Sequence, residues 1–110
     1  MTDEFAYAPG QIVTVFRSRL RPDAAPDFQA VAAEMLETAR AMPGFVDYKV
    51  YVAEDGERVS VIVFETAEQQ RAWREHPRHR AAQQAGRERF YSDYSMQISV
   101  CTAAWRFPDA

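Results

Sequence analysis

A β-hairpin signal near the middle of the chain constrains the fold most strongly. The runs FVDYKVYVA (residues 45–53) and RVSVIVFE (residues 58–65) are rich in β-branched and aromatic residues, and Asp55-Gly56 lies between them. Asp-Gly favours the tight turns that join antiparallel strands, because glycine adopts positive φ without steric strain. The sequence therefore predicts an antiparallel hairpin around which the other elements must pack.

Two further segments, one before and one after the hairpin, carry the alternation of a strand. Residues 11–20 (QIVTVFRSRL) and residues 91–101 (YSDYSMQISVC) each divide into two interleaved sets of side chains. Such a period of two predicts a strand with distinct faces. In the last segment the apolar and aromatic set is Tyr94, Met96, Ile98 and Val100.

Between the first strand and the hairpin, apolar residues recur at steps of three and four. They are Phe28, Val31, Met35, Ala39 and Met42. This spacing predicts an amphipathic helix with one apolar face. Asp23 is the expected N-cap residue, Pro26 is expected in the first turn, and Pro43-Gly44 ends the helix.

A second helical region is predicted after the hairpin. Thr66 and Gln69 have the spacing of a capping box, in which both side chains satisfy backbone donors at a helix start. His76-Pro77 interrupts the region, because proline disfavours helical geometry in the residue before it and suits the first position of a new helix. We therefore expect two short helices, the second of which runs toward Gly86.

The predicted order is β-α-β-β-α-β. This order is typical of the α+β, ferredoxin-like split βαβ fold, in which a four-stranded antiparallel sheet carries its helices on one face. A chain of 110 residues fits one domain, residues 1–110.

The third strand is apolar on both sides. Val59, Val61 and Val63 point one way, and Ile62 and Phe64 point the other. Because helices cover only one side of such a sheet, a second copy of the chain is the expected cover for the other side. The sequence thus predicts a homodimer.

Composition excludes several classes of partner. A net charge of −3 gives no field for nucleic acid or anionic lipid, and the arginines between residues 71 and 89 fit a solvated helix face. The N-terminus has Asp3 and Glu4 where an export signal would be basic, and no apolar run approaches a membrane span. We expect a cytoplasmic protein.

Cys101 is the only cysteine, which excludes an intramolecular disulfide.

Residues 71–94 hold the richest set of reactive side chains, with Trp73, His76 and His79 among them. Histidine is well suited to moving a proton near neutral pH, although His76 beside Pro77 also fits a simple helix cap. Two histidines without a third ligand at suitable spacing do not predict a metal site. Aromatic residues near Trp73 suit either a pocket or a core.

Several segments together resemble the antibiotic biosynthesis monooxygenase family over residues 11–101. They are FRSRLRPD, ARAMPGFVDYKVY, VFET, RAWREHPRHRAA and FYSDYSMQISVC. The resemblance implies a dimeric α+β barrel, in which two ferredoxin-like sheets meet and each subunit has a pocket between sheet and helices.

The resemblance also implies a function. Members include cofactor-independent enzymes that oxidise phenols with molecular oxygen, relatives that oxidise quinol-type compounds, and haem degraders. The first hypothesis is a monooxygenase that acts on a phenolic or quinol-like aromatic without a cofactor. Trp73 and His79 are then the expected catalytic residues, with a neighbouring tyrosine as the alternative proton carrier and an arginine for the oxyanion. Phe64, His76 and Tyr94 are the expected substrate contacts.

Two alternatives stay open. The first is a dimer of the same fold that binds a small ligand without chemistry. The second is a haem-binding or haem-degrading monooxygenase. Haem degraders of the family rely on an asparagine in the first strand and a histidine about ten positions after the tryptophan. This sequence contains no asparagine, and His79 follows Trp73 by six positions.

Overall fold

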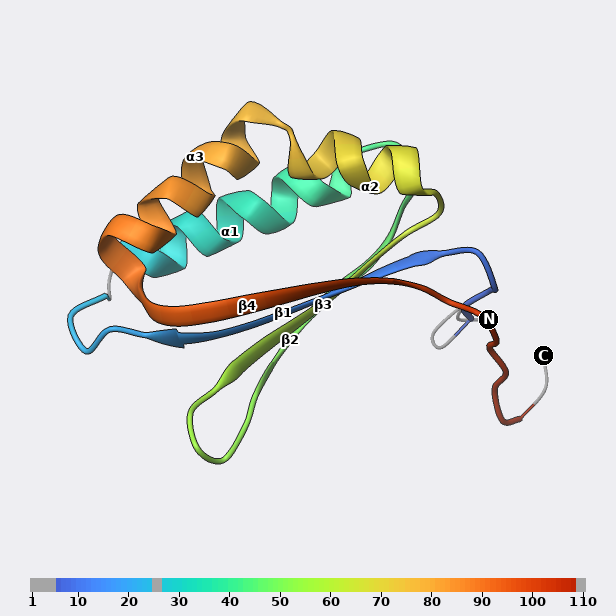
Figure 1. Ribbon diagram of the computed structural model, residues 1–110, viewed down its shortest axis with the longest axis horizontal. Helices are drawn as coiled ribbons and strands as arrows, with labels where there is room; N and C mark the ends of the chain where they lie inside the picture. Colours follow the sequence, from blue (N-terminus) through green and yellow to red (C-terminus); the bar gives the residue numbers. More distant parts are fainter. Residues whose placement is uncertain (1–5, 25–26, 109–110) are drawn as a thin grey trace.

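The chain folds into a four-stranded antiparallel sheet with its helices on one face (Figure 1). A computed structural model describes residues 6–24 and 27–108. The strand order is β2-β3-β1-β4. The elements are β1 (Ile12–Leu20), α1 (Asp27–Arg40), β2 (Phe45–Val52), β3 (Arg58–Phe64), α2 (Ala67–Arg74), α3 (Pro77–Ala85), the π-helical turn η1 (Gly86–Phe90) and β4 (Tyr91–Val100). The predicted ferredoxin-like α+β fold is confirmed.

The predicted hairpin joins β2 and β3. Gly56 has φ of +91°, the conformation for which glycine is needed at this turn. The amide of Ala53 donates to the carbonyl oxygen of Glu57 at 2.8 Å, and Val52 lies opposite Arg58. This register places alternate residues of β3 on the helix side and on the open side of the sheet.

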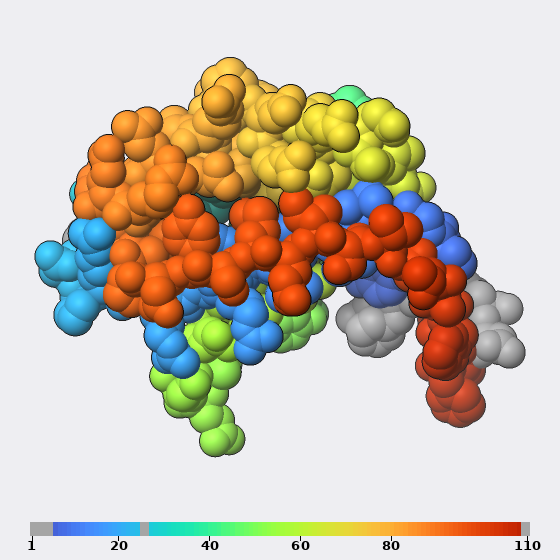
Figure 2. Space-filling view, viewed as in Figure 1, coloured from blue at the N-terminus to red at the C-terminus, as the bar shows by residue number. Residues whose placement is uncertain are grey.

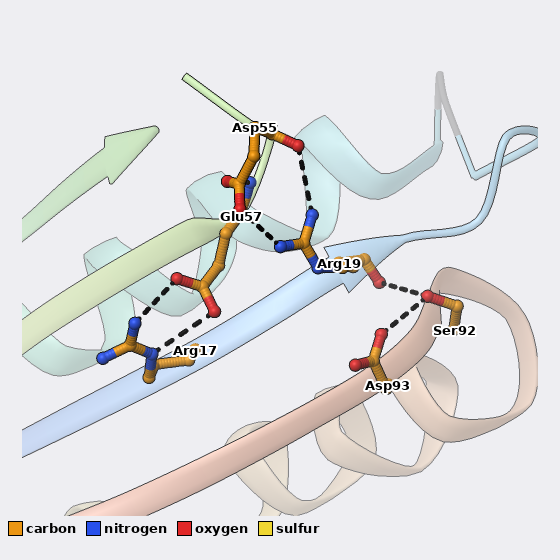
Figure 3. Close-up of polar contacts among 6 residues, drawn as sticks. All are labelled: Arg17, Arg19, Asp55, Glu57, Ser92 and Asp93. Carbon is orange, nitrogen blue, oxygen red and sulfur yellow. Dashed lines mark hydrogen bonds and ion pairs between the residues drawn. The ribbon is translucent and has the colours of Figure 1, made fainter. Parts of the chain in front are cut away.

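Ion pairs fasten the hairpin turn to the neighbouring strand β1 (Figure 3). Arg17 Nη2 lies 2.9 Å from Glu57 Oε1, and Arg19 Nη2 lies 2.8 Å from Asp55 Oδ2. On the other side of β1, the Ser92 hydroxyl donates to the carbonyl oxygen of Arg19 at 3.3 Å. Because these groups are solvent-exposed, each pair adds little to stability, but together they form a polar rim at this end of the sheet.

Helix α1 is described from Asp27, and the two residues before it lie outside the described residues, so the capping of this helix by Asp23 stays a prediction. Pro26 lies outside the described residues. At the other end the chain turns at Gly44, which has φ of +81°. A Cβ there would collide with the side chain of Gln69, so α2 packs closely against this turn.

The start of α2 forms half of the predicted capping box. Thr66 Oγ1 accepts a hydrogen bond from the amide of Gln69 at 3.2 Å. The reciprocal bond is not formed, because Gln69 Oε1 is buried and finds no hydrogen-bond partner in the described part of the chain. The close approach to Gly44 accounts for this, since it directs the glutamine side chain into the packing between α2 and the turn.

The predicted break at His76-Pro77 is confirmed. Nδ1 of His76 accepts a hydrogen bond from the amide of Arg78 at 3.1 Å, and Pro77 is the first residue of α3. The sequence did not predict η1, which carries the chain from α3 into β4 and buries Phe90 to 2% exposure. The break and this turn together allow α2 and α3 to follow the same face of the sheet.

The core lies between the helices and the sheet. One cluster consists of Ala39, Ile62, Phe64 and Trp73. A second cluster, at the opposite end of α1, contains Phe28 and Phe90. Within residues 6–24 and 27–108, no helix is long and apolar enough to span a bilayer.

Candidate functional site

A cavity of about 70 Å³ lies between the two core clusters, under the helices. Its walls include Thr14 and Ile62 from the sheet, Met35 from α1, Trp73 from α2 and His79 from α3. We call it the Trp73 chamber. Figure 2 shows a hollow between α3 and β4, the elements that contribute Gln83 and Met96 to the wall.

A second space of about 240 Å³ adjoins this chamber toward the hairpin end of the sheet. The two spaces share the wall residues Phe16, Met35, Tyr48, Ala82 and Tyr91. The second space adds Ser18, Phe28, Arg58 and Ser60, among others, and we call it the Arg58 chamber. Together the chambers reach the lower end of the range for drug-sized ligands, roughly 300–1,000 Å³.

Trp73 forms the rear wall of its chamber. Its ring stacks on Phe64 with centroids 5.4 Å apart, and Tyr48 meets it edge-on at 6.3 Å. Only 3% of the residue is exposed, and its indole Nε1 is buried without a hydrogen-bond partner among the described residues. A buried donor without a partner is energetically unfavourable. The indole N–H is therefore a donor that the described residues leave unsatisfied.

His79 lies beside Trp73, with ring centroids 4.3 Å apart. Its Nδ1 is 3.0 Å from the carbonyl oxygen of Arg74. Because a carbonyl oxygen only accepts hydrogen bonds, Nδ1 carries the hydrogen, and Nε2 holds the lone pair in the neutral ring. Burial lowers the pKa of His79, although the Arg74 carbonyl opposes this change. His79 is therefore a neutral proton acceptor at neutral pH.

The cavity tyrosines behave differently from His79. Burial raises the pKa of Tyr48, despite a hydrogen bond to Ser60 that lowers it. Burial also raises the pKa of Tyr91 to about 12. Both phenols therefore keep their protons at neutral pH and act as hydrogen-bond donors rather than as bases. Of the two proton carriers that the sequence left open, these pKa directions favour His79.

The structure brings Trp73 and His79 together, but it places the other three expected site residues outside both chambers. Phe64 is fully buried behind Trp73. His76 caps α3. Tyr94 is 37% exposed on β4, where Arg87 Nη1 donates to its hydroxyl at 3.4 Å.

Sequence reasoning missed Arg58 as a cavity residue. The alternation of β3 contained the signal, because Arg58 and Ser60 share a side of the strand with Ile62, which faces the helices. The buried pair Thr14 and Gln70 was also missed, with Gln70 Nε2 donating to Thr14 Oγ1 at 3.4 Å. Among the described residues, no group of three or more His, Cys, Asp or Glu side chains could hold a metal ion.

Known proteins share this fold. The structure of SnoaB, a cofactor-independent oxygenase from Streptomyces nogalater, matches with a TM-score of 0.70 at 20% identity, over 93% of this chain and all of that one. Rv0793 from Mycobacterium tuberculosis matches with a TM-score of 0.74 at 20% identity, over 90% and 99%. At such identities the likeness establishes the fold alone.

Sequence comparison is more specific. The uncharacterized protein YqjZ of Bacillus subtilis (strain 168) is 28% identical over 68 residues, which span 62% of this chain and 60% of YqjZ. The family model described as antibiotic biosynthesis monooxygenase matches residues 11–85, from β1 to the end of α3. The chain therefore belongs to the antibiotic biosynthesis monooxygenase family.

Proposed function

We propose that the chain is a small-molecule monooxygenase that oxidises a phenolic or quinol-like aromatic with molecular oxygen and without a cofactor. The observation that carries this proposal is the pair of Trp73 and His79 in the wall of one apolar chamber. Trp73 offers an unsatisfied N–H donor, and His79 offers a neutral nitrogen base. The description of SnoaB as a cofactor-independent oxygenase supports the same class of reaction.

The proposed reaction needs only a base, a donor and an apolar cavity. Nε2 of His79 takes the proton of a phenolic hydroxyl, and the Trp73 N–H stabilises the oxygen on which charge develops. The electron-rich phenolate forms a carbon–oxygen bond with O₂, and the resulting peroxide loses water to give a quinone. One oxygen atom enters the product and the other leaves as water. The substrate supplies all the electrons, so no external reductant is required.

The residues do not fit haem. The space beside His79 encloses about 70 Å³, and Trp73 lies against the histidine ring. The haem alternative would therefore require the helices to move away from the sheet.

Oxygen uptake with a panel of phenols, quinols and dihydroxynaphthalenes tests the proposed reaction. With a chelator present and no cofactor added, we expect oxygen consumption to match quinone formation. Isotopically labelled O₂ should place one labelled atom in the product. If ligands quench the fluorescence of Trp73 but none is oxidised, the non-catalytic binding dimer becomes the better explanation.

We also propose a homodimer formed through the open side of the sheet. Val13, Val15, Val59, Val61 and Val63 form a stripe there, which we call the valine face. Val63 is buried, but the other four are only half-buried in the single subunit. The ion pairs of the hairpin turn, which Figure 3 shows, lie beyond one end of this stripe and would form part of a polar rim if a second copy covered it.

Sedimentation at low micromolar concentration tests the dimer. Twice the protomer mass is expected for the natural chain. Val61→Lys places a charge in the centre of the valine face and should yield monomers, because an unpaired buried charge opposes association. Ala72→Lys, which adds the same charge on the exposed side of α2, should remain dimeric. A well-folded natural protomer that sediments alone would contradict the proposal.

A further inference from the structure

Arg58 lies in the same cavity as Trp73 and His79, at its other end. Adjacent pairs across β1 and β3 are Thr14 with Ile62, Phe16 with Ser60, and Ser18 with Arg58. Alternation directs Ile62 and Arg58 to the helix side of β3, four residues apart. At about 3.3 Å per residue, their Cα atoms are separated by roughly 13 Å along the strand. Ile62 lines the Trp73 chamber, and Arg58 lines the adjoining one.

Arg58 is half-buried, and its guanidinium group forms no ion pair within residues 6–24 and 27–108. Four ion pairs form among the described residues, and they use Arg17, Arg19, Arg78 and Arg89. The Arg58 carbon Cζ instead lies 5.0 Å from the ring centroid of Phe28. By contrast, Arg89 combines a ring contact with an ion pair to Asp27 at 2.6 Å.

The wall around Arg58 is otherwise uncharged. Apart from Arg58, the described side chains of the Arg58 chamber are apolar, aromatic, hydroxyl or amide groups. Ser60 and Ser18 offer hydroxyls beside the guanidinium group, and Tyr48 and Tyr91 link this space to the Trp73 chamber. The positive charge of Arg58 opposes the effect of burial on the pKa values of both tyrosines. One uncompensated positive charge therefore acts on the interior of the cavity.

We infer that Arg58 selects an aromatic substrate that carries a carboxylate at the end remote from the ring that is oxidised. This inference rests on the proposed function, since it assumes that the oxidised ring lies between Trp73 and His79. A single guanidinium group complements a single negative charge and binds a planar carboxylate through two parallel N–H donors. The separation along β3 requires a ligand longer than a single ring, so the fitting class is a fused-ring aromatic acid.

Binding of two matched ligands tests this inference. The ligands are a dihydroxynaphthoate and its primary amide, which has nearly the same shape without the charge. Quenching of Trp73 fluorescence reports binding, provided that Trp105→Phe is present in every protein, because Trp105 is 87% exposed and would add background. Circular dichroism checks that each variant is folded.

We expect the acid to bind at least about tenfold more tightly than the amide, as a charge-assisted hydrogen bond predicts. Arg58→Gln should remove this preference, and Arg58→Lys should retain part of it. Arg80→Gln, which removes an exposed arginine of α3, should leave the preference unchanged. These three variants separate a local contact from a general effect of net charge.

The two kinds of failure are distinguishable. If the natural chain binds acid and amide equally, the inference about Arg58 is wrong and the proposed aromatic site stands. The inference about Arg58 is also wrong if Arg58→Gln keeps the preference for the acid. If neither ligand quenches Trp73, the proposed function loses its site and the inference fails with it. If Arg58→Gln does not fold, equal binding of acid and amide to the natural chain still overturns the inference, and a reduced preference in Arg58→Lys beside an unchanged one in Arg80→Gln still supports it.

Discussion

Replacing His79 with glutamine is expected to lower turnover by about 10²- to 10⁴-fold, the usual contribution of general base catalysis. Glutamine retains a polar side chain of similar length but cannot accept and carry a proton. The measurement is kcat for oxygen uptake with the best substrate of the panel. Binding of that substrate should change little, because Trp73 and the rest of the wall remain. A variant that keeps the natural turnover would remove His79 from the mechanism.

The pH dependence of kcat/KM gives an independent signature of the same residue. Burial places the pKa of His79 below its ordinary value of 6.5. The ring must be neutral to accept a proton. The value of kcat/KM should therefore fall as the pH decreases through this lowered pKa, and it should reach its full value above that pKa. His79→Gln should lack this acidic limb. A limb centred above 6.5 would indicate another group.

His76 provides the contrast within the same segment. Its ring caps α3 and lines neither chamber, whereas the sequence-based expectation made it a substrate contact. His76→Asn keeps an acceptor at the cap, since asparagine is a favoured N-cap residue. Natural turnover in this variant, next to a large loss in His79→Gln, would assign the proton transfer to one histidine.

Local chemistry explains which parts of the fold were predictable. Gly56 and Pro77 act within their own turns, so the hairpin and the break between α2 and α3 could be predicted from short segments. The cap of α1 could not be fixed from the sequence, because Asp23 is only one of several residues in that segment that can cap a helix. The turn η1 has no comparable local signal, since its geometry depends on how Phe90 enters the core.

The residues of the candidate site were likewise predictable only in part. Trp73 and His79 could be selected as candidates because both lie on one short helical region, yet only the fold shows that they share a chamber. Arg58 was overlooked because its place in the cavity wall depends on how several elements pack, and a charged residue at a strand start usually faces solvent. Side-chain type identified the reactive groups, and tertiary packing decided which of them meet.

Phe64→Ala is expected to destabilise the fold by about 3–5 kcal/mol, the range for deleting a buried aromatic side chain. The residue is 0% exposed, stacks on Trp73 and meets Phe45 edge-on with centroids 5.9 Å apart. Equilibrium unfolding in denaturant measures the loss. Phe107→Ala is the matched control. Because Phe107 is 95% exposed, its removal should change stability by no more than about 0.5 kcal/mol.

Phe64→Leu then separates support of the site from contact with substrate. Leucine fills much of the space behind Trp73, so the loss of stability should be smaller than for alanine. If Phe64 only supports the tryptophan, KM should stay close to the natural value in a folded Phe64→Leu protein. If KM rises while stability is unchanged, the ring touches substrate after all, and the cavity must extend past Trp73 when a ligand binds. Trp73 stacks directly on Phe64 and separates it from the chamber. An unchanged KM therefore supports this wall, and a raised KM indicates that the wall opens when a ligand binds.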